Sequence, residues 1–130
     1  MDSIQLLTRK GANCTDLLSC LYGLKPMELQ VFYELASKGR ASVDDLSAGV
    51  GRDRTTVHRC LSKLVSASLA YRQTSSLKGG GYQYVYTSVE PSKIRDQAEE
   101  RVREVTASLL SLVDNFEKNL GQRLRELKAA

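Results

Sequence analysis

The sequence predicts a mainly α-helical protein with one small β-hairpin and a long C-terminal helix. Apolar residues recur at helical spacing in three segments between residues 25 and 67. Two stretches of alternating side chains, 69–74 and 82–87, then flank the glycine-rich segment SSLKGGG. From Pro91 to Leu127 the chain is rich in helix formers and contains a single glycine. Three helices followed by a hairpin is the element order of a winged helix-turn-helix, extended here by a C-terminal helix of coiled-coil type.

Length and composition indicate one folded domain with an appendage. The chain has 130 residues, of which 42% are hydrophobic and 26% charged, as in ordinary soluble globular proteins. The formal net charge is +4 and the pI is about 9.0, which permits a polyanionic partner without selecting one. The charge is concentrated, because residues 52–78 carry six basic side chains and one acidic side chain, a local net charge of +5.

Several other classes of protein are disfavoured. No apolar run approaches the roughly 20 residues of a membrane-spanning helix, and the N-terminus lacks a signal core, so we expect a cytoplasmic protein without a membrane partner. Three cysteines without a C-x-x-C pair are expected to be reduced, small apolar side chains rather than a redox switch or metal ligands. The single histidine has no catalytic partner nearby, and the glycines lack the context of a phosphate-binding loop. We therefore expect no catalytic residues, metal or cofactor.

Turns and caps place the first helices. Up to Gly23, apolar residues next to possible cap residues predict one short helical arm of about two turns. Pro26 opens the first helix of the winged domain, and Gly39 closes it. We expect three parts: a helical arm over 1–24, a winged helix-turn-helix over 25–90 and a dimerisation helix over 91–130.

Cap residues also place the next two helices. The segment from Ser42 to Asp45 has the spacing of a capping box and opens a second, shorter helix that ends before Gly51. Asp53 is expected to cap the third helix by accepting the backbone N–H of Thr56.

The third helix, over residues 53–67, has two different faces. Four apolar side chains fall together on a 3.6-residue period: Val57, Cys60, Leu61 and Leu64. The opposite face is polar and basic and carries Thr55, His58, Arg59 and Ser62. Such a helix fits the major groove of DNA, where an arginine can donate two hydrogen bonds to guanine. The alternative is an ordinary solvated face, which the order of elements disfavours.

Two consecutive runs, DLLSCLYGLKPMELQVFYELASKG and SVDDLSAGVGRDRTTVHRCLSKLVSASLAYR, resemble the DNA-binding half of archaeal TrmB-type transcriptional regulators. MarR-like winged helices are more distantly similar. The positions that match the first helix of the family are Leu21, Gly23, Leu24, Glu28, Val31, Phe32 and Leu35. The positions that match its recognition helix are Arg54 to Arg59, Leu61 and Leu64.

This resemblance covers about residues 16–89 and implies that Thr55, Thr56, His58 and Arg59 sit at the DNA groove. Full-length TrmB regulators also carry a C-terminal sugar-binding domain, whereas one long helix follows the hairpin here. Sugar sensing is therefore not expected.

The hairpin is expected to form the wing. Its loop would bring Lys78 to a phosphate or to the minor groove, with Arg72 supporting it from the strand. The alternative is a flexible turn without a function. Tyr82, Tyr84 and Tyr86 share one strand face and could stack unpaired bases, but we expect them to pack on the helices.

The basic and polar residues of these two elements make up the expected DNA interface. Its nine members are Arg52, Arg54, Thr55, Thr56, His58, Arg59, Lys63, Arg72 and Lys78. Arg52 and Arg54 lie at the start of the third helix, where they suit phosphates better than bases.

The C-terminal helix carries an apolar stripe that we call the seam. Its members are Val102, Val105, Leu109, Leu112, Phe116, Leu120 and Leu124, and Leu127 continues it. The spacings of three and four, with one four-residue stutter, suit pairing with another helix. A lone helix of this length, about 55 Å, would expose the stripe to water, so the expected partner is the same helix of a second subunit. Folding back over its own domain is the alternative.

The leading hypothesis is a homodimeric, sequence-specific regulator of transcription that binds double-stranded DNA and has no catalytic activity. Two recognition helices related by a two-fold axis would read half-sites roughly 34 Å apart. The alternative is a winged-helix module that binds another protein without reading DNA directly. No residue indicates whether a small-molecule effector acts.

Overall fold

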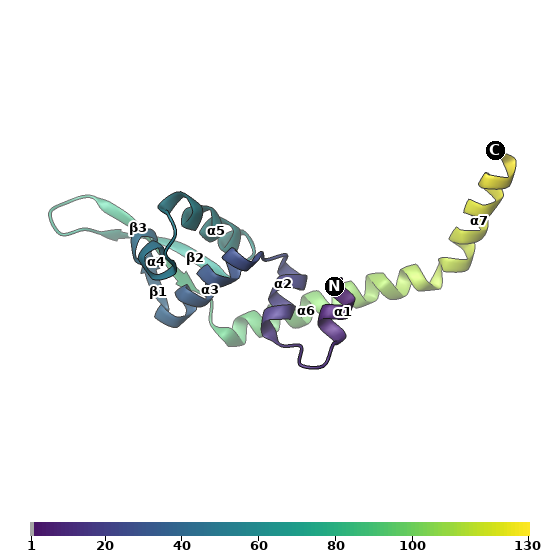
Figure 1. Ribbon diagram of the computed structural model, residues 1–130, viewed down its shortest axis with the longest axis horizontal. Coiled ribbons are helices and arrows are strands. Elements are labelled where there is room, and N and C mark those ends of the chain that lie inside the picture. Colours follow the sequence, from purple (N-terminus) through teal and green to yellow (C-terminus); the bar gives the residue numbers. More distant parts are fainter. Residues whose placement is uncertain (1) are drawn as a thin grey trace. The chain divides into compact units, whose positions relative to one another are not determined.

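The computed structural model describes residues 2–130, which form seven helices and three strands (Figure 1). In chain order the elements are α1 (Ser3–Thr8), α2 (Cys14–Tyr22), α3 (Pro26–Lys38), β1 (Arg40–Ser42), α4 (Val43–Val50), α5 (Arg54–Ser66), β2 (Ala70–Ser76), β3 (Tyr82–Ser88), α6 (Pro91–Asp114) and α7 (Phe116–Ala129). The chain divides into two compact units, residues 1–94 and residues 95–130. The predicted class, mainly α-helical with a small β-hairpin in a winged helix-turn-helix, is confirmed.

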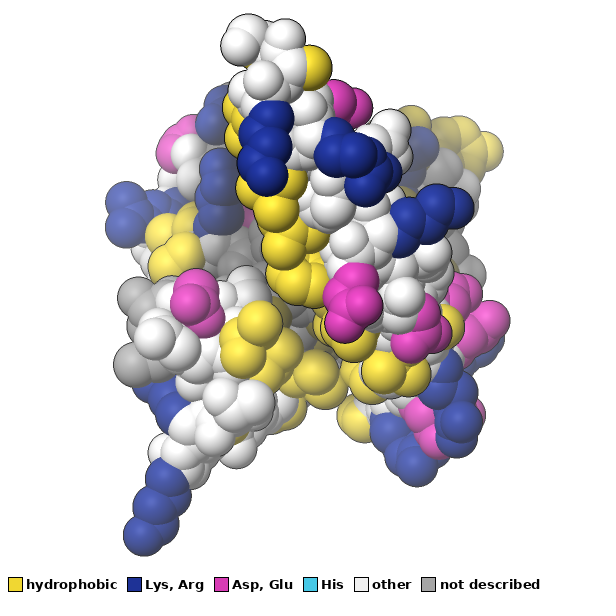
Figure 2. All heavy atoms as spheres, turned by 90° about the vertical axis from the view of Figure 1, so that its right-hand side faces the viewer, with side chains coloured by type: hydrophobic (Ala, Val, Ile, Leu, Met, Phe, Trp, Pro, Cys, Tyr) yellow, Lys and Arg dark blue, Asp and Glu magenta, His cyan; other side chains and the backbone are white. Residues whose placement is uncertain are grey.

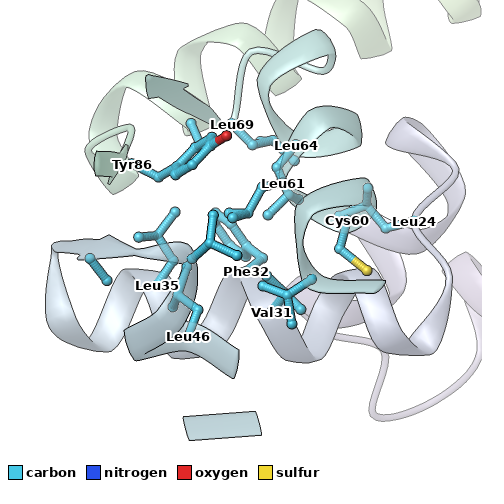
Figure 3. Close-up of a cluster of buried hydrophobic side chains, with 14 of the residues drawn as sticks. Leu24, Val31, Phe32, Leu35, Leu46, Cys60, Leu61, Leu64, Leu69 and Tyr86 are labelled. Atoms are coloured by element: carbon cyan, nitrogen blue, oxygen red, sulfur yellow. The ribbon is translucent and has the colours of Figure 1, made fainter. Parts of the chain in front are cut away.

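Helices α3, α4 and α5 pack with the sheet around one apolar core (Figure 3). Leu35 of α3, Leu46 of α4 and Leu61 of α5 are completely buried, and Tyr86 of β3 closes the core from the sheet. The four apolar positions predicted for the inner face of the third helix are all buried. Burying one large aliphatic side chain contributes about 1.5–3 kcal/mol, so this face fixes the rotation of α5 about its axis.

The ends of α4 follow the predicted cap residues. The backbone N–H of Asp45 donates to the Ser42 hydroxyl oxygen at 3.1 Å, and the Ser42 N–H donates to the Asp45 carboxylate at 3.5 Å. Gly51 ends the helix with a φ of +68°, a left-handed conformation that glycine adopts readily. The chain therefore turns directly from α4 into α5.

The sheet contains a third strand that the sequence prediction missed. β1 pairs with β3 and β3 pairs with β2, all antiparallel, so the order in the sheet is β1-β3-β2. In the hairpin, Ala70 is opposite Ser88 and Ser76 is opposite Tyr82. With three residues, β1 is too short to show an alternating pattern, and its pairing depends on a partner more than 40 residues away.

The predicted N-terminal helix of about two turns is present as α2, but the segment also forms a second helix, α1, that the prediction missed. Each has its own cap: the Gln5 N–H donates to the Asp2 carboxylate at 2.9 Å, and the Asn13 N–H donates to the Asp16 carboxylate at 3.0 Å. Leu18 of α2 joins the apolar core. The division of the sequence into an arm, a winged domain and a dimerisation helix stays a prediction.

The prediction of one uninterrupted C-terminal helix is wrong. Asn115, with φ −97° and ψ 4°, separates α6 from α7, and the ribbon changes direction there (Figure 1). Its side-chain amide donates to the carbonyl oxygen of Ser111 at 2.9 Å, a local bond by which asparagine competes with helical backbone bonding. The interruption falls between Leu112 and Phe116 of the seam, just before the stutter.

Across residues 2–130, every helix is too short or too polar to cross a lipid bilayer.

Candidate nucleic-acid interface

Two hydrogen bonds fix the first turn of α5. The backbone N–H and the hydroxyl of Thr56 donate to the Asp53 carboxylate at 3.1 Å and 2.6 Å. The Thr56 hydroxyl, and after it the Thr56 N–H, lower the pKa of Asp53, so its carboxylate stays ionised at the positive end of the helix dipole. Thr56 is half-buried and directs its hydroxyl to this cap rather than to the outer face.

The face of α5 opposite the core is open to solvent. Thr55, His58 and Arg59 are exposed along it, and Ser62 extends the same face. Within residues 2–130, the side chains of these four residues have no hydrogen-bond or ion-pair partner. Lys63 is half-buried beside them. This face therefore offers hydrogen-bonding groups that the protein itself does not use.

The two arginines at the start of α5 have different surroundings. Arg54 forms an ion pair with Asp44 at the start of α4, and the two side chains are 66% and 67% exposed. The Arg52 N–H donates to the Ser47 carbonyl oxygen at 3.2 Å, and the Arg52 carbonyl oxygen accepts the Ser47 hydroxyl. Ser47 therefore holds the turn from which the exposed Arg52 side chain projects.

The β2–β3 hairpin forms the wing, and its loop extends away from the helices of the first unit (Figure 1). The Leu77 N–H donates to the Gly81 carbonyl oxygen at 3.0 Å and closes the loop. The three consecutive glycines of the loop have φ between +83° and +102°, where any side chain would be strained. Lys78, which precedes them, is exposed.

The tyrosines of β3 were predicted to pack on the helices, and this is correct only for Tyr86. Its side chain is 2% exposed, whereas Tyr84 is 49% exposed and Tyr82 is 75% exposed. The strand continues past the region that the helices cover, so the outer tyrosines have nothing to pack on. The guanidinium carbon of Arg72 lies 4.2 Å from the centre of the Tyr84 ring, a cation–π contact.

The seam runs along α6 and α7 as an exposed apolar strip. Its seven members are 42% to 64% exposed, and Leu110 and Val113 widen the strip near the end of α6. Figure 2 shows α7 in its upper part, with apolar side chains in a row along the helix and basic side chains beside the row.

A family model described as "Sugar-specific transcriptional regulator TrmB" matches residues 18–92. The chain belongs to the TrmB family. The matched residues include α3, α4, α5 and the whole wing, so they contain every residue expected to bind DNA. The resemblance inferred from residues 16–89 is confirmed, and the protein is a member of a family of transcriptional regulators.

Two proteins of Methanocaldococcus jannaschii are similar to this TrmB-family chain. Uncharacterized protein MJ1503 is 33% identical over 73 residues, which are 56% of this chain and 55% of that protein. The chain thus spans just over half the length of this relative. Uncharacterized protein MJ1082 is 32% identical over 104 residues, which are 80% of this chain and 86% of that protein.

Two solved archaeal structures have a similar fold. A possible transcriptional regulator from Methanosarcina mazei Go1 superposes with a TM-score of 0.64 and 24% identity, over 91% of this TrmB-family chain and 93% of that protein. The ST1889 protein from Sulfolobus tokodaii gives a TM-score of 0.61 and 18% identity, over 81% and 98% of the two chains. At these identities the similarity shows the fold alone.

The three cysteines of this TrmB-family protein are free thiols. Burial in the core raises the pKa of Cys60, which keeps its thiol protonated and unreactive. Cys14 is exposed and Cys20 is half-buried. Among residues 2–130, no three His, Cys, Asp or Glu side chains are grouped as ligands for a metal ion.

Two features of the interface escaped the sequence analysis. Asp44 was assigned only to the capping segment, since its ten-residue separation from Arg54 gives no helical spacing by which a pair could be recognised. The contact between Arg72 and Tyr84 depends on the strand register, which the alternating pattern of the two strands does not specify by itself.

Proposed function

We propose that this TrmB-family protein is a sequence-specific, double-stranded DNA-binding regulator of transcription that acts as a homodimer. The observation that carries the proposal is the outer face of α5, where Thr55, His58 and Arg59 are exposed and have no side-chain partner within residues 2–130. A helix that packs by one face and offers hydrogen-bonding groups on the other fits the major groove. The local charge of +5 over residues 52–78 favours a polyanion.

Within this proposal the interface residues that contact DNA divide into two groups. Thr55, His58 and Arg59 reach base edges, where Arg59 can donate two hydrogen bonds to guanine and the Thr55 methyl group can contact that of thymine. The remaining basic residues bind phosphates and fix the register of the protein on DNA: Arg52, Arg54, Lys63, Arg72 and Lys78. Thr56 acts indirectly, by holding Asp53 and the first turn of α5.

The exposed seam supports the homodimer. An apolar strip that runs through both C-terminal helices is unfavourable in water, at about 25 cal/mol for each Å². A second copy of the chain carries the same strip and can cover it with two-fold symmetry. Dimerisation would also join two weak DNA contacts into one stronger contact through their effective concentration.

Selection of bound sequences from a pool of random duplexes, followed by fluorescence anisotropy on the selected duplex, tests this function. We expect a two-fold symmetric sequence with half-sites roughly 34 Å apart, and an affinity that falls linearly on a plot of log K against log salt. Light scattering should give the mass of two 14.4 kDa chains. A pool without enrichment and no binding at low salt would contradict the proposal.

A further inference from the structure

We infer that Tyr82 and Tyr84 of the wing, together with Arg72, bind the sugar–phosphate backbone of duplex DNA. The inference rests on the proposed function, because it adds a contact to the same interface. We call the surface formed by Arg72, Thr74, Tyr82 and Tyr84 the wing face. This contact would give a function to Tyr82 and Tyr84, whose aromatic side chains are exposed to solvent.

The strand register places these residues on one side of the hairpin. Thr74 is opposite Tyr84 and Arg72 is opposite Tyr86, and directly paired residues in an antiparallel sheet point to the same side. Tyr86 points into the core formed with α3 and α5 (Figure 3). The wing face therefore lies on the same side of the sheet as α3 and α5, beyond the part of that side that these helices cover.

Burial decreases steadily along this side, from Tyr86 in the core to the largely exposed ring of Tyr82. A tyrosine has an apolar body and a polar tip, so its full exposure leaves unfavourable apolar surface in water. Deoxyribose rings offer apolar surface beside charged phosphates, which matches both parts of the side chain.

Charge distinguishes the wing face from the opposite side of the hairpin. Arg72 is the only charged residue in β2 and β3, and within residues 2–130 it has no ion-pair partner. The Tyr84 ring, rather than a carboxylate, holds its guanidinium on the wing face, so the N–H groups remain available to a phosphate. The opposite side carries neutral residues such as Gln73 and Gln83. A polyanion is therefore expected to bind the wing face rather than the opposite side of the hairpin.

The chemistry of tyrosine gives this contact a measurable signature. A phenol hydroxyl donates a hydrogen bond to a phosphate oxygen, but it is neutral and displaces no counterion. Binding by Tyr82 and Tyr84 should therefore lower Kd without changing its dependence on salt. A lysine contact changes both, because each neutralised phosphate contributes about 0.9 to the slope of log K against log salt.

Anisotropy titrations with Tyr82→Phe and Tyr84→Phe test the inference, since both variants keep the ring and remove the hydroxyl. We expect each to raise Kd by about three- to tenfold on selected and random duplexes alike, with an unchanged salt slope. Lys78→Ala should reduce the slope by about 0.9. Tyr71→Phe is the matched control, because Tyr71 is 46% exposed on the opposite side of the hairpin, and its Kd should not change.

A double-mutant cycle tests whether Tyr84 also positions Arg72. Tyr84→Leu removes the ring and should weaken binding more than Tyr84→Phe. The additional loss should disappear in an Arg72→Ala background, because the ring then has no guanidinium to hold.

The outcomes separate the inference from the function on which it rests. Variants are compared only if their melting temperature equals that of the unmodified protein. Equal Kd values for the unmodified protein and both Phe variants would overturn the inference and leave the proposed function intact. A greater loss on single-stranded than on duplex DNA would also overturn it, because the rings would then stack on unpaired bases. If the unmodified protein binds no duplex DNA, both the inference and the proposed function are contradicted.

Discussion

The carboxylate of Asp44, at the start of α4, pairs with the guanidinium of Arg54, in the first turn of α5. The pair joins the two helices of the helix-turn-helix on their solvent side. Because both side chains are mostly exposed, it contributes at most about 1 kcal/mol to stability. Its larger effect is expected on binding, since a carboxylate beside a phosphate contact repels DNA.

Asp44→Asn is therefore expected to strengthen binding to selected and random duplexes alike, by up to about fivefold. The salt slope should become steeper, because Arg54 is released to a phosphate. Anisotropy titrations at several salt concentrations measure both effects. In an Arg54→Ala background, the change in slope should vanish. Weaker binding by Asp44→Asn would show instead that the carboxylate holds Arg54 in its binding position.

Arg59→Ala is expected to relax the choice of base, because it removes a side chain from the open face of α5. The selected duplex should lose about 1–3 kcal/mol of binding free energy, and random duplexes much less. Lys78→Ala should weaken both by the same factor, since a phosphate contact carries no sequence information. Lys118→Ala, an exposed cation on α7, is the control and should change neither. Equal losses for Arg59→Ala on both duplexes would remove it from the base-reading group.

Leu109→Glu is expected to produce monomers, because it places a charge in the middle of the seam. Leu109 is exposed in the single chain, so the substitution leaves the apolar core of residues 1–94 unchanged. Light scattering should show a halved mass, and the affinity for a two-site duplex should fall towards that for a half-site. Ala107→Glu introduces the same charge on the opposite side of α6 and should remain dimeric. A dimeric Leu109→Glu protein would contradict the seam as the interface.

The cap of α5 is expected to give stability a measurable pH dependence. The folded-state pKa of Asp53 lies below its ordinary value of 3.8, so the folded state binds fewer protons at this site than the unfolded state. The stabilisation is fully present above pH 3.8 and is lost as the pH falls through the lower folded-state pKa.

Urea unfolding of the unmodified protein and of Asp53→Asn isolates this contribution. Asparagine keeps a capping oxygen but has no charge to titrate. The difference in unfolding free energy should favour the unmodified protein more at about pH 6 than at about pH 3. A difference that does not vary with pH would show that the lowered pKa has no effect on folding.

The sequence predicted those parts of the fold that depend on local patterns. The spacing of Val57, Leu61 and Leu64 was sufficient to orient α5. Apolar side chains at helical spacing lie on one face of the helix, and that face is most stable when it packs against the core. The Ser42 and Asp53 caps were recognisable because their hydrogen bonds reach only three residues along the chain.

The features that were missed depend on distant parts of the chain. Pairing of Arg40–Ser42 with β3, and of Asp44 with Arg54, is decided by how the helices pack. The exposure of Tyr82 depends on where the helices stop covering the sheet. The sequence of β3 alone does not indicate this position. Asn115 is different, since its competing hydrogen bond is local and its neighbours Asp114 and Phe116 are weak helix formers, but the longer helix-forming stretches beyond them concealed it.

The glycine loop at the end of the wing determines how closely the backbone of the wing can approach DNA. Beyond Lys78, three successive residues have no side chain, and their backbone conformation resists the addition of one. A loop without side chains lets its backbone come directly against a phosphate, so any side chain introduced at positions 79 to 81 is expected to hold the wing away from the DNA.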